Sequence, residues 1–124
     1  MVRLMEVIEI LKALADETRI RILNLLYRDT LCVCDLEEIL KLNQSNASRH
    51  ITKLKQAKLI VGKKQAQWIY YRVNEKTLDR YSFVKELLNQ ELDNVPQCQK
   101  DLVRLKKYRG LGGCCELSVT IADG

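Results

Sequence analysis

The chain of 124 residues carries 21 Lys and Arg against 16 Asp and Glu, which gives a formal net charge of +5. This length suits a single hydrophobic core, and a hydrophobic content of 47% is that of an ordinary globular protein and not of a disordered one. No apolar run approaches the roughly 20 residues that span a bilayer, and no secretory signal opens the sequence. We therefore expect a cytoplasmic protein without a membrane partner.

The positive charge is concentrated in one part of the sequence. No Asp or Glu occurs between Ile39 and Asn74, so all sixteen acids lie in the flanking segments. This block predicts a face that binds phosphate, although a solvated basic surface has the same composition. Its basic residues are Lys41, Arg49, Lys53, Lys55, Lys58, Lys63, Lys64 and Arg72.

The first thirty residues have the apolar spacing of two helices. A helix over residues 4–14 is predicted to have one apolar face, because its apolar residues recur every three or four positions. Asp16 is a suitable N-cap for a second helix, in which Ile20, Leu23 and Leu26 continue the same period up to about residue 28.

The next segment has the pattern of a helix-turn-helix unit. Residues 30–33 are apolar and β-branched, which predicts a short strand. Asp35 can cap a helix that ends near Lys41, and Asn43 can cap a helix over residues 44–57. Two helices joined by so short a turn form the helix-turn-helix unit.

Residues 59–61 and 68–73 favour strands, and the polar residues 62–67 between them predict a hairpin, which beside a helix-turn-helix is a wing. A long helix is predicted over residues 78–92, and the basic stretch 100–109 is helical or partly ordered. The predicted fold is mainly α with a small β-hairpin: a homodimeric winged helix-turn-helix. Residues 1–94 are predicted to form the DNA-binding and dimerisation domain, and residues 95–124 a partly flexible, cysteine-containing C-terminal extension.

The predicted helix over 44–57 is rich in side chains that bind base edges or phosphates. Asn and Gln can pair with adenine and Arg with guanine, while Lys and Ser contact the DNA backbone. An ordinary polar surface helix is the alternative interpretation, and His50 could instead be a partly buried residue of this helix. We predict operator double-stranded DNA as the partner, with the contacts made by Gln44, Ser45, Asn46, Ser48, Arg49, His50, Lys53 and Lys55, and by Lys63, Lys64 and Gln67 at the wing.

Five cysteines in a chain without an export signal argue against a disulfide framework and for metal binding, redox sensing or core packing. Cys32 and Cys34 alternate about Val33, so an extended strand would place both sulfurs on one face. The exposed amides of a helix start favour the thiolate, which binds soft ions. We predict Cys32 and Cys34 as the primary metal ligands, and two small core residues are the alternative.

Three further cysteines lie near the C-terminus. Cys98, Cys114 and Cys115 can form a site of their own, lend a ligand to the first pair, or be incidental. No enzyme is predicted, because the single histidine, His50, belongs to the predicted DNA-reading helix and nothing completes a catalytic arrangement around a cysteine.

Four motifs in order resemble the ArsR/SmtB family of metal-sensing repressors. The resemblance covers residues 7–73 and rests on ALADETRIRIL at 13–23, LCVCDL at 31–36, SNASRHI at 45–51 and WIYYR at 68–72. It implies a homodimeric winged-helix repressor that binds its own operator and leaves it when an inducer binds.

Within this family, the CVCDL element resembles the type that responds to arsenite or antimonite, in which both cysteines ligate the metalloid. The resemblance therefore implies As(III) or Sb(III) as inducer and no organic cofactor. That type often has a third cysteine three residues after the second, where this chain has Glu37. A repressor of the same fold that senses thiol oxidation, or cadmium or lead, is the alternative.

Overall fold

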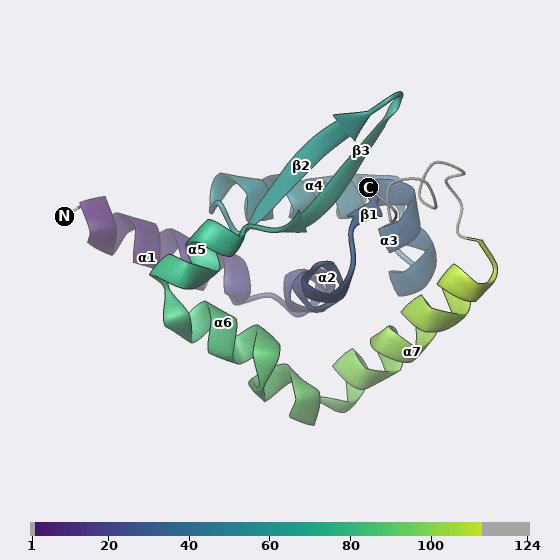
Figure 1. The fold of residues 1–124 in the computed structure, drawn as a ribbon. Helices are drawn as coiled ribbons and strands as arrows, with labels where there is room; N and C mark the ends of the chain where they lie inside the picture. The colour runs from purple at the N-terminus through teal and green to yellow at the C-terminus, as the bar shows by residue number, and fades with distance from the viewer. Residues whose placement is uncertain (1, 113–124) are drawn as a thin grey trace.

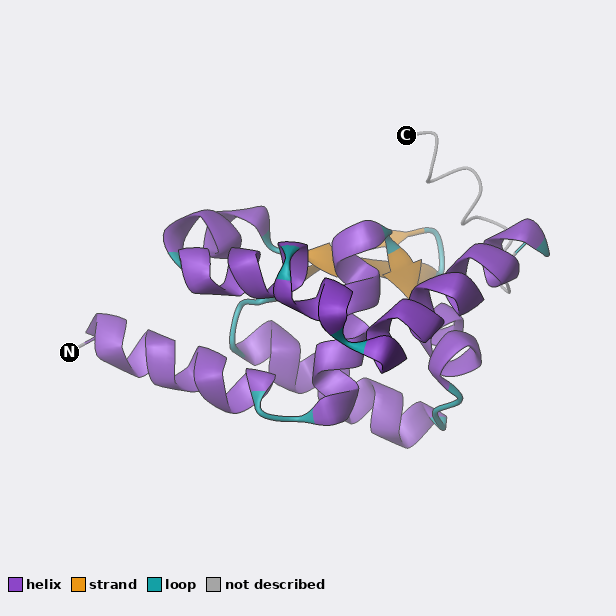
Figure 2. Cartoon of the chain, turned by 90° about the horizontal axis from the view of Figure 1, so that it is seen from below, coloured by secondary structure: helices purple, strands orange, loops and turns teal. Residues whose placement is uncertain are grey.

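The computed structural model describes residues 2–112. Figure 1 shows the helices around a short β-sheet, and Figure 2 shows α1 extending away from the other helices. The elements in chain order are α1 (Val2–Leu14), α2 (Glu17–Arg28), β1 (Leu31–Cys32), α3 (Val33–Leu40), α4 (Gln44–Gln56), β2 (Ile60–Gln65), β3 (Trp68–Val73), α5 (Glu75–Arg80), α6 (Ser82–Asn89), the 3₁₀ helix η1 (Glu91–Asn94) and α7 (Pro96–Gly110).

The predicted helix starts are confirmed at two of their caps. The Asp16 carboxylate accepts the backbone N–H of Arg19 at 3.0 Å, and α2 follows. The Asn43 side chain accepts the backbone N–H of Asn46 at 2.8 Å, and α4 follows. Each cap satisfies one of the amides that a helix start leaves without a partner inside the helix.

The sheet is antiparallel with strand order β1-β3-β2. The first wing strand is longer than predicted, because the polar residues 62–65 pair with β3 and leave only residues 66–67 as the turn, whereas β3 covers the predicted residues 68–73. Gly62 lies opposite Tyr71, and a Cβ atom at position 62 would lie 2.7 Å from Cε1 of the Tyr71 ring. The absence of a side chain at Gly62 therefore lets Tyr71 pack across the wing.

The segment predicted as one helix over residues 78–92 forms α5, α6 and η1. Its apolar residues are buried as the period predicts, including Leu78, Val84 and Leu88. The backbone leaves the helical conformation at Tyr81 (φ −121°, ψ 84°) and again at Gln90. The apolar spacing thus identified the buried face correctly, whereas the break at Tyr81 accompanies a long-range contact, in which the Tyr81 hydroxyl donates to Glu6 of α1 at 2.7 Å.

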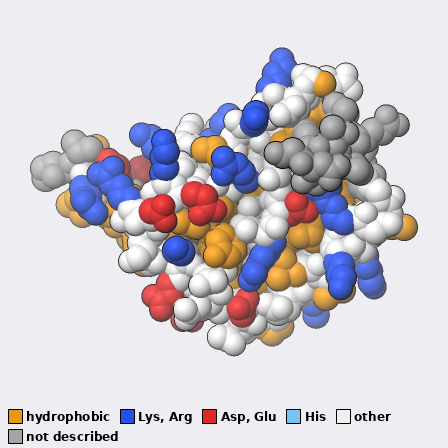
Figure 3. Space-filling model, viewed as in Figure 1, with side chains coloured by type: hydrophobic (Ala, Val, Ile, Leu, Met, Phe, Trp, Pro, Cys, Tyr) orange, Lys and Arg blue, Asp and Glu red, His pale blue; other side chains and the backbone are white. Residues whose placement is uncertain are grey.

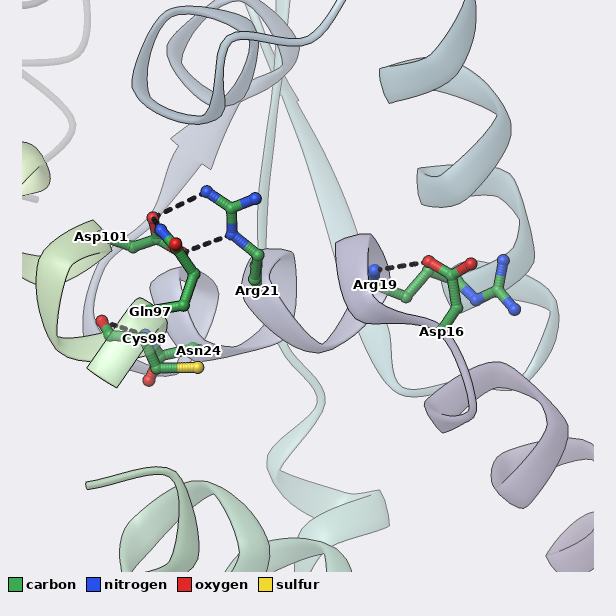
Figure 4. Close-up of polar contacts among 7 residues, drawn as sticks. All are labelled: Asp16, Arg19, Arg21, Asn24, Gln97, Cys98 and Asp101. Carbon is green, nitrogen blue, oxygen red and sulfur yellow. Dashed lines mark hydrogen bonds and ion pairs between the residues drawn. The ribbon is translucent and has the colours of Figure 1, made fainter. Parts of the chain in front are cut away.

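Helix α7 packs against α2 and α3. Arg21 of α2 donates two hydrogen bonds, of 2.8 and 2.9 Å, to the fully buried carboxylate of Asp101 (Figure 4). Asn24 donates to the carbonyl oxygen of Cys98 at 3.1 Å. A paired guanidinium offsets the cost of burying the carboxylate, so these contacts fix α7 on α2. The division of the chain between residues 94 and 95 stays a prediction.

Helix α4 is also held from the side of α2. The Arg19 guanidinium lies 3.1 Å from His50 Nδ1 and donates to the carbonyl oxygens of Ala13 and Lys12 at the end of α1. Because a guanidinium only donates, His50 Nδ1 must accept, so the ring is neutral in this arrangement. Within residues 2–112, no helix is long and apolar enough to cross a membrane.

We predict that acid destabilises the fold through His50. Burial lowers the pKa of His50 below its usual 6.5, against an opposing effect of Asp16 at 3.8 Å. The unfolded chain then binds more protons than the folded one, so the free energy of unfolding decreases as the pH falls below about 6.5. Urea denaturation at pH 7.5 and 5.5 measures this decrease.

The matched control is His50→Asn, which retains a hydrogen-bond acceptor for Arg19 but does not titrate in this range. Because His50 is the only histidine, the variant should lose less stability between the two pH values than the natural chain. Equal losses in both proteins would contradict the assignment to His50.

Candidate nucleic-acid interface and thiol site

The first candidate site is the outer face of α4. Gln44, Ser45, Ser48 and Arg49 are exposed on its first half, and Asn46 between them is half-buried. Arg49 donates to the Asn46 amide oxygen at 3.1 Å, which orients both side chains. The residues predicted to read bases thus lie together at the N-terminal end of the second helix of the helix-turn-helix, the end that enters the major groove in such units.

Basic side chains extend this face toward the wing. Lys53, Lys55, Lys63 and Lys64 are exposed, as is Gln67 at the turn. The Lys55 ammonium lies 5.9 Å from the centroid of the Tyr71 ring, which connects α4 to β3. Figure 3 shows Lys and Arg side chains toward the tip of the wing. These positions suit contacts with the DNA backbone.

His50 is placed differently from the other predicted DNA contacts. It is 6% exposed and faces Arg19 and Asp16 on the inner side of α4 (residues 16 and 19 are drawn in Figure 4). In this structure the ring therefore supports the helix from within. The spacing of α4 could have indicated this orientation, since His50 lies one position before the buried Ile51 and three after the buried Ala47.

The second candidate site lies where β1 becomes α3. Cys32 ends β1 and is the N-cap of α3, and Cys34 is the second residue of the helix. Their sulfur atoms are 3.2 Å apart. The helix begins earlier than predicted, at Val33, so Asp35, the predicted cap, is its third residue. The two sulfurs therefore lie across the turn from β1 to α3 and not along an extended strand.

Asp35 is the site residue that the sequence did not reveal. One ligand atom each from Cys32, Cys34 and Asp35 lies within 4.8 Å of the others. Asp35 is fully buried; its Oδ2 accepts the backbone N–H of Cys32 at 3.0 Å, and its Oδ1 accepts the hydroxyl of Tyr108 from α7. The sequence marked Asp35 as a helix cap and gave no signal for Tyr108, which is 73 residues away.

Aromatic residues of β3 surround the thiols. Cys32 pairs with Tyr70 across the sheet, and Trp68 and Cys34 pack against this buried pair. Trp68 is the only tryptophan of the chain, so its fluorescence reports on this environment.

The remaining cysteines are distributed differently. Cys98 is buried in the main core at the start of α7, where burial, assisted by Asp101 and opposed by Arg21, raises the pKa of its thiol. Tyr108 lies ten positions further along the chain, about 15 Å along a helix. Among the described residues, Cys98 is therefore not part of the Cys32–Cys34–Asp35 cluster. Cys114 and Cys115 lie outside the described residues.

The donor set fits a soft ion. Two sulfurs 3.2 Å apart can converge on one centre, and thiolates are the ligands that soft metals and metalloids prefer. The adjacent carboxylate supplies an oxygen atom near the same centre.

Comparisons with known proteins agree with this architecture. The family described as "Bacterial regulatory protein, arsR family" matches residues 16–61, which contain the thiol cluster and α4. A solved homodimeric winged helix-turn-helix DNA-binding domain from Mycobacterium bovis, titled a possible ArsR-family regulator, is similar with a TM-score of 0.62 and 26% identity, covering 74% of this chain and 86% of that one. Both matches are DNA-binding transcriptional regulators by their descriptions.

Two curated relatives come from Pseudomonas putida. The arsenic resistance transcriptional regulator ArsR1 is 41% identical over 66 residues, which are 52% of this chain, and the chain thus spans about half the length of that relative (52%). The regulator ArsR2 is 36% identical over 104 residues, which are 82% of this chain and 88% of ArsR2. With this identity over most of both chains, the protein belongs to the ArsR family of bacterial regulatory proteins.

Proposed function

We infer that this chain is an ArsR-type transcriptional repressor, which binds operator DNA as a homodimer and is released when As(III) or Sb(III) is ligated by Cys32 and Cys34. The observation that carries this proposal is the position of the thiol pair: its sulfurs are 3.2 Å apart at the start of α3, and α3 packs directly against α4. The names of the relatives, which are arsenic resistance regulators, support it. Such a repressor works in the cytoplasm, where its operator is.

Exposed apolar side chains support the homodimer. Leu4, Ile8 and Leu11 recur on one face of α1 and are 59%, 41% and 47% exposed. Phe83 of α6 is exposed as well, and its ring packs edge-on against Tyr81, which contacts α1. Burial of this apolar surface against a second copy favours association and places two α4 helices in one particle, as two half-sites about 34 Å apart require.

The mechanism follows from the connection between α3 and α4. The two helices are joined by only three residues, and Lys41 among them is in the left-handed conformation (φ 56°). Bonds from one ion to both sulfurs replace their direct 3.2 Å contact, so Cys32 and Cys34 reorient and the first turn of α3 is reshaped. Because α3 supports α4, the recognition helix then no longer fits the second half-site. Tighter DNA binding and weaker inducer binding are the same coupling free energy, typically about 1–3 kcal/mol.

Two other triggers use the same thiols. Oxidation of the pair by peroxide, or ligation of cadmium or lead, would act at the same turn. The neighbouring Asp35 oxygen also suits these two divalent ions, since cadmium and lead accept mixed sulfur and oxygen ligands. The inducer titrations below include these reagents.

For the DNA interface, we predict that Arg49→Ala weakens binding to a duplex selected from a random pool by about 1–3 kcal/mol and relaxes its base preference. Lys53→Ala should weaken binding to all DNA sequences alike. It should also reduce by about 1 the slope of the logarithm of the binding constant against the logarithm of salt concentration. Lys85→Ala on α6, an exposed lysine outside the basic block, is the matched control and should bind normally. Equal effects of Arg49→Ala and Lys85→Ala would contradict the assignment of α4.

For the thiol site, we predict that the double variant Cys32→Ser, Cys34→Ser binds the selected duplex but is no longer released by arsenite, because a hydroxyl is not a soft ligand. Fluorescence anisotropy of labelled duplex during arsenite titration measures the release, and Cys98→Ser, with the buried thiol outside the cluster, should respond normally. Release of the double variant at the natural arsenite concentration would refute the site. Parallel titrations with cadmium, lead and peroxide identify the trigger.

A further inference from the structure

The last turn of α7 is bonded to the segment that carries the thiols. Tyr108 donates its hydroxyl hydrogen to Asp35, three residues after Cys32. Arg109 donates to the Asp29 carboxylate at 2.8 Å and to the Thr30 carbonyl oxygen at 2.8 Å, just before Cys32. The two neighbouring residues of α7 thus hold the chain on both sides of the thiol pair.

The other half of α7 is fixed independently of the thiols. Asp101, fully buried, is paired with Arg21 and also accepts a hydrogen bond from Gln97 at 3.0 Å. Figure 1 shows α7 running from the end of η1 toward α3. Because α2 holds the middle of the helix, its last turn is a firm attachment point and not a frayed end.

Asp35 connects the end of α7 to the backbone of Cys32. One carboxylate oxygen accepts the N–H of Cys32 and the other accepts the Tyr108 hydroxyl, so the backbone at Cys32 and the end of α7 share one buried group. Replacing the direct 3.2 Å contact of the two sulfurs by bonds to one ion shifts the first turn of α3, to which Asp35 belongs, relative to Tyr108. A contact that is present before ligation and lost after it opposes ligation by its own free energy.

We propose that Tyr108 is a positioning residue of the thiol site: acting through Asp35, it holds the first turn of α3 in the DNA-binding arrangement and thereby sets the inducer concentration at which the protein leaves DNA. This proposal rests on the proposed function for its inducer and deepens it, because it adds α7 to the elements that control the switch.

The test is Tyr108→Phe in the full chain, with Tyr81→Phe as matched control. Both variants remove one tyrosine hydroxyl that donates to a carboxylate, but the partner of Tyr81 is Glu6 of α1, away from the thiols. The first readout is the rate at which iodoacetamide alkylates the cysteines of residues 29–41 in protein that has first been fully reduced. Trypsin releases this peptide by cleavage after Arg28 and Lys41, and it contains Cys32 and Cys34 and no other cysteine.

We expect Tyr108→Phe to raise this alkylation rate about tenfold, which is the effect of losing one hydrogen bond to a carboxylate from the arrangement that buries Cys32. The arsenite concentration for half-release from DNA should fall by about the same factor. Tyr81→Phe should leave both values unchanged, even where thermal denaturation shows that it costs as much stability. A merely structural role of Tyr108 would change the melting temperature and neither of these values.

Unchanged alkylation and release in Tyr108→Phe, or equal changes in Tyr81→Phe, would overturn the proposal. If circular dichroism shows that Tyr108→Phe is unfolded, Arg109→Gln is measured instead. This variant removes the bonds to Asp29 and Thr30. Unchanged alkylation and release in Arg109→Gln, or equal changes in Tyr81→Phe, would then overturn the proposal. The alkylation rate involves neither arsenite nor DNA. It therefore judges the role of Tyr108 even if the Cys32, Cys34 double variant shows that the inducer binds elsewhere.

Discussion

Asp35 is a buried carboxylate, and the arrangement around the thiols depends on it. A carboxylate without water is costly unless hydrogen bonds replace its hydration. Here the N–H of Cys32 and the hydroxyl of Tyr108 donate to it, one from the start of α3 and the other from the end of α7. Satisfying this one group fixes the turn at which the two sulfurs meet and fixes α7 against it.

A second set of contacts holds the recognition helix from the other side. Arg19 binds the last carbonyl groups of α1 and contacts His50 in the middle of α4. The N-terminal end of α4 follows α3 after a short turn, whereas its middle is held by α2. In the mechanism we propose, a displacement of α3 would tilt α4 about His50. A change at Cys32 and Cys34 would thereby reach DNA without any direct contact between these cysteines and the duplex.

Much of the fold could be predicted because it depends on local chemistry. The caps Asp16 and Asn43, the apolar spacing of the helices and the paired strands of the wing are all encoded within a few residues of where they act. The exposed polar residues of α4 could be predicted for the same reason, since short turns and helix spacing define the outer face. The DNA-contact and metal-ligand roles of these residues stay predictions.

The missed features depend on contacts between distant parts of the chain. The hydroxyl of Tyr108 meets Asp35 from 73 residues away, and Arg21 meets Asp101 from 80 residues away. No spacing rule predicts such pairs. The break of the predicted helix at Tyr81 accompanies a contact with Glu6 in α1, and the inward orientation of His50 depends on Arg19 in α2. In each case a polar side chain found a partner on another element, which apolar periodicity does not encode.

Ligation at the thiol pair, as we propose it, reorganises α3 together with its attachment to α7. Hydrogen exchange of the backbone amides, followed by mass spectrometry with and without arsenite, measures both elements at once. We expect exchange to change together in the peptides covering residues 29–41 and 101–112, and both changes to vanish when Cys32 and Cys34 are replaced by Ser. Arsenite-dependent changes that spare residues 29–41, or that persist in the double variant, would contradict this proposal.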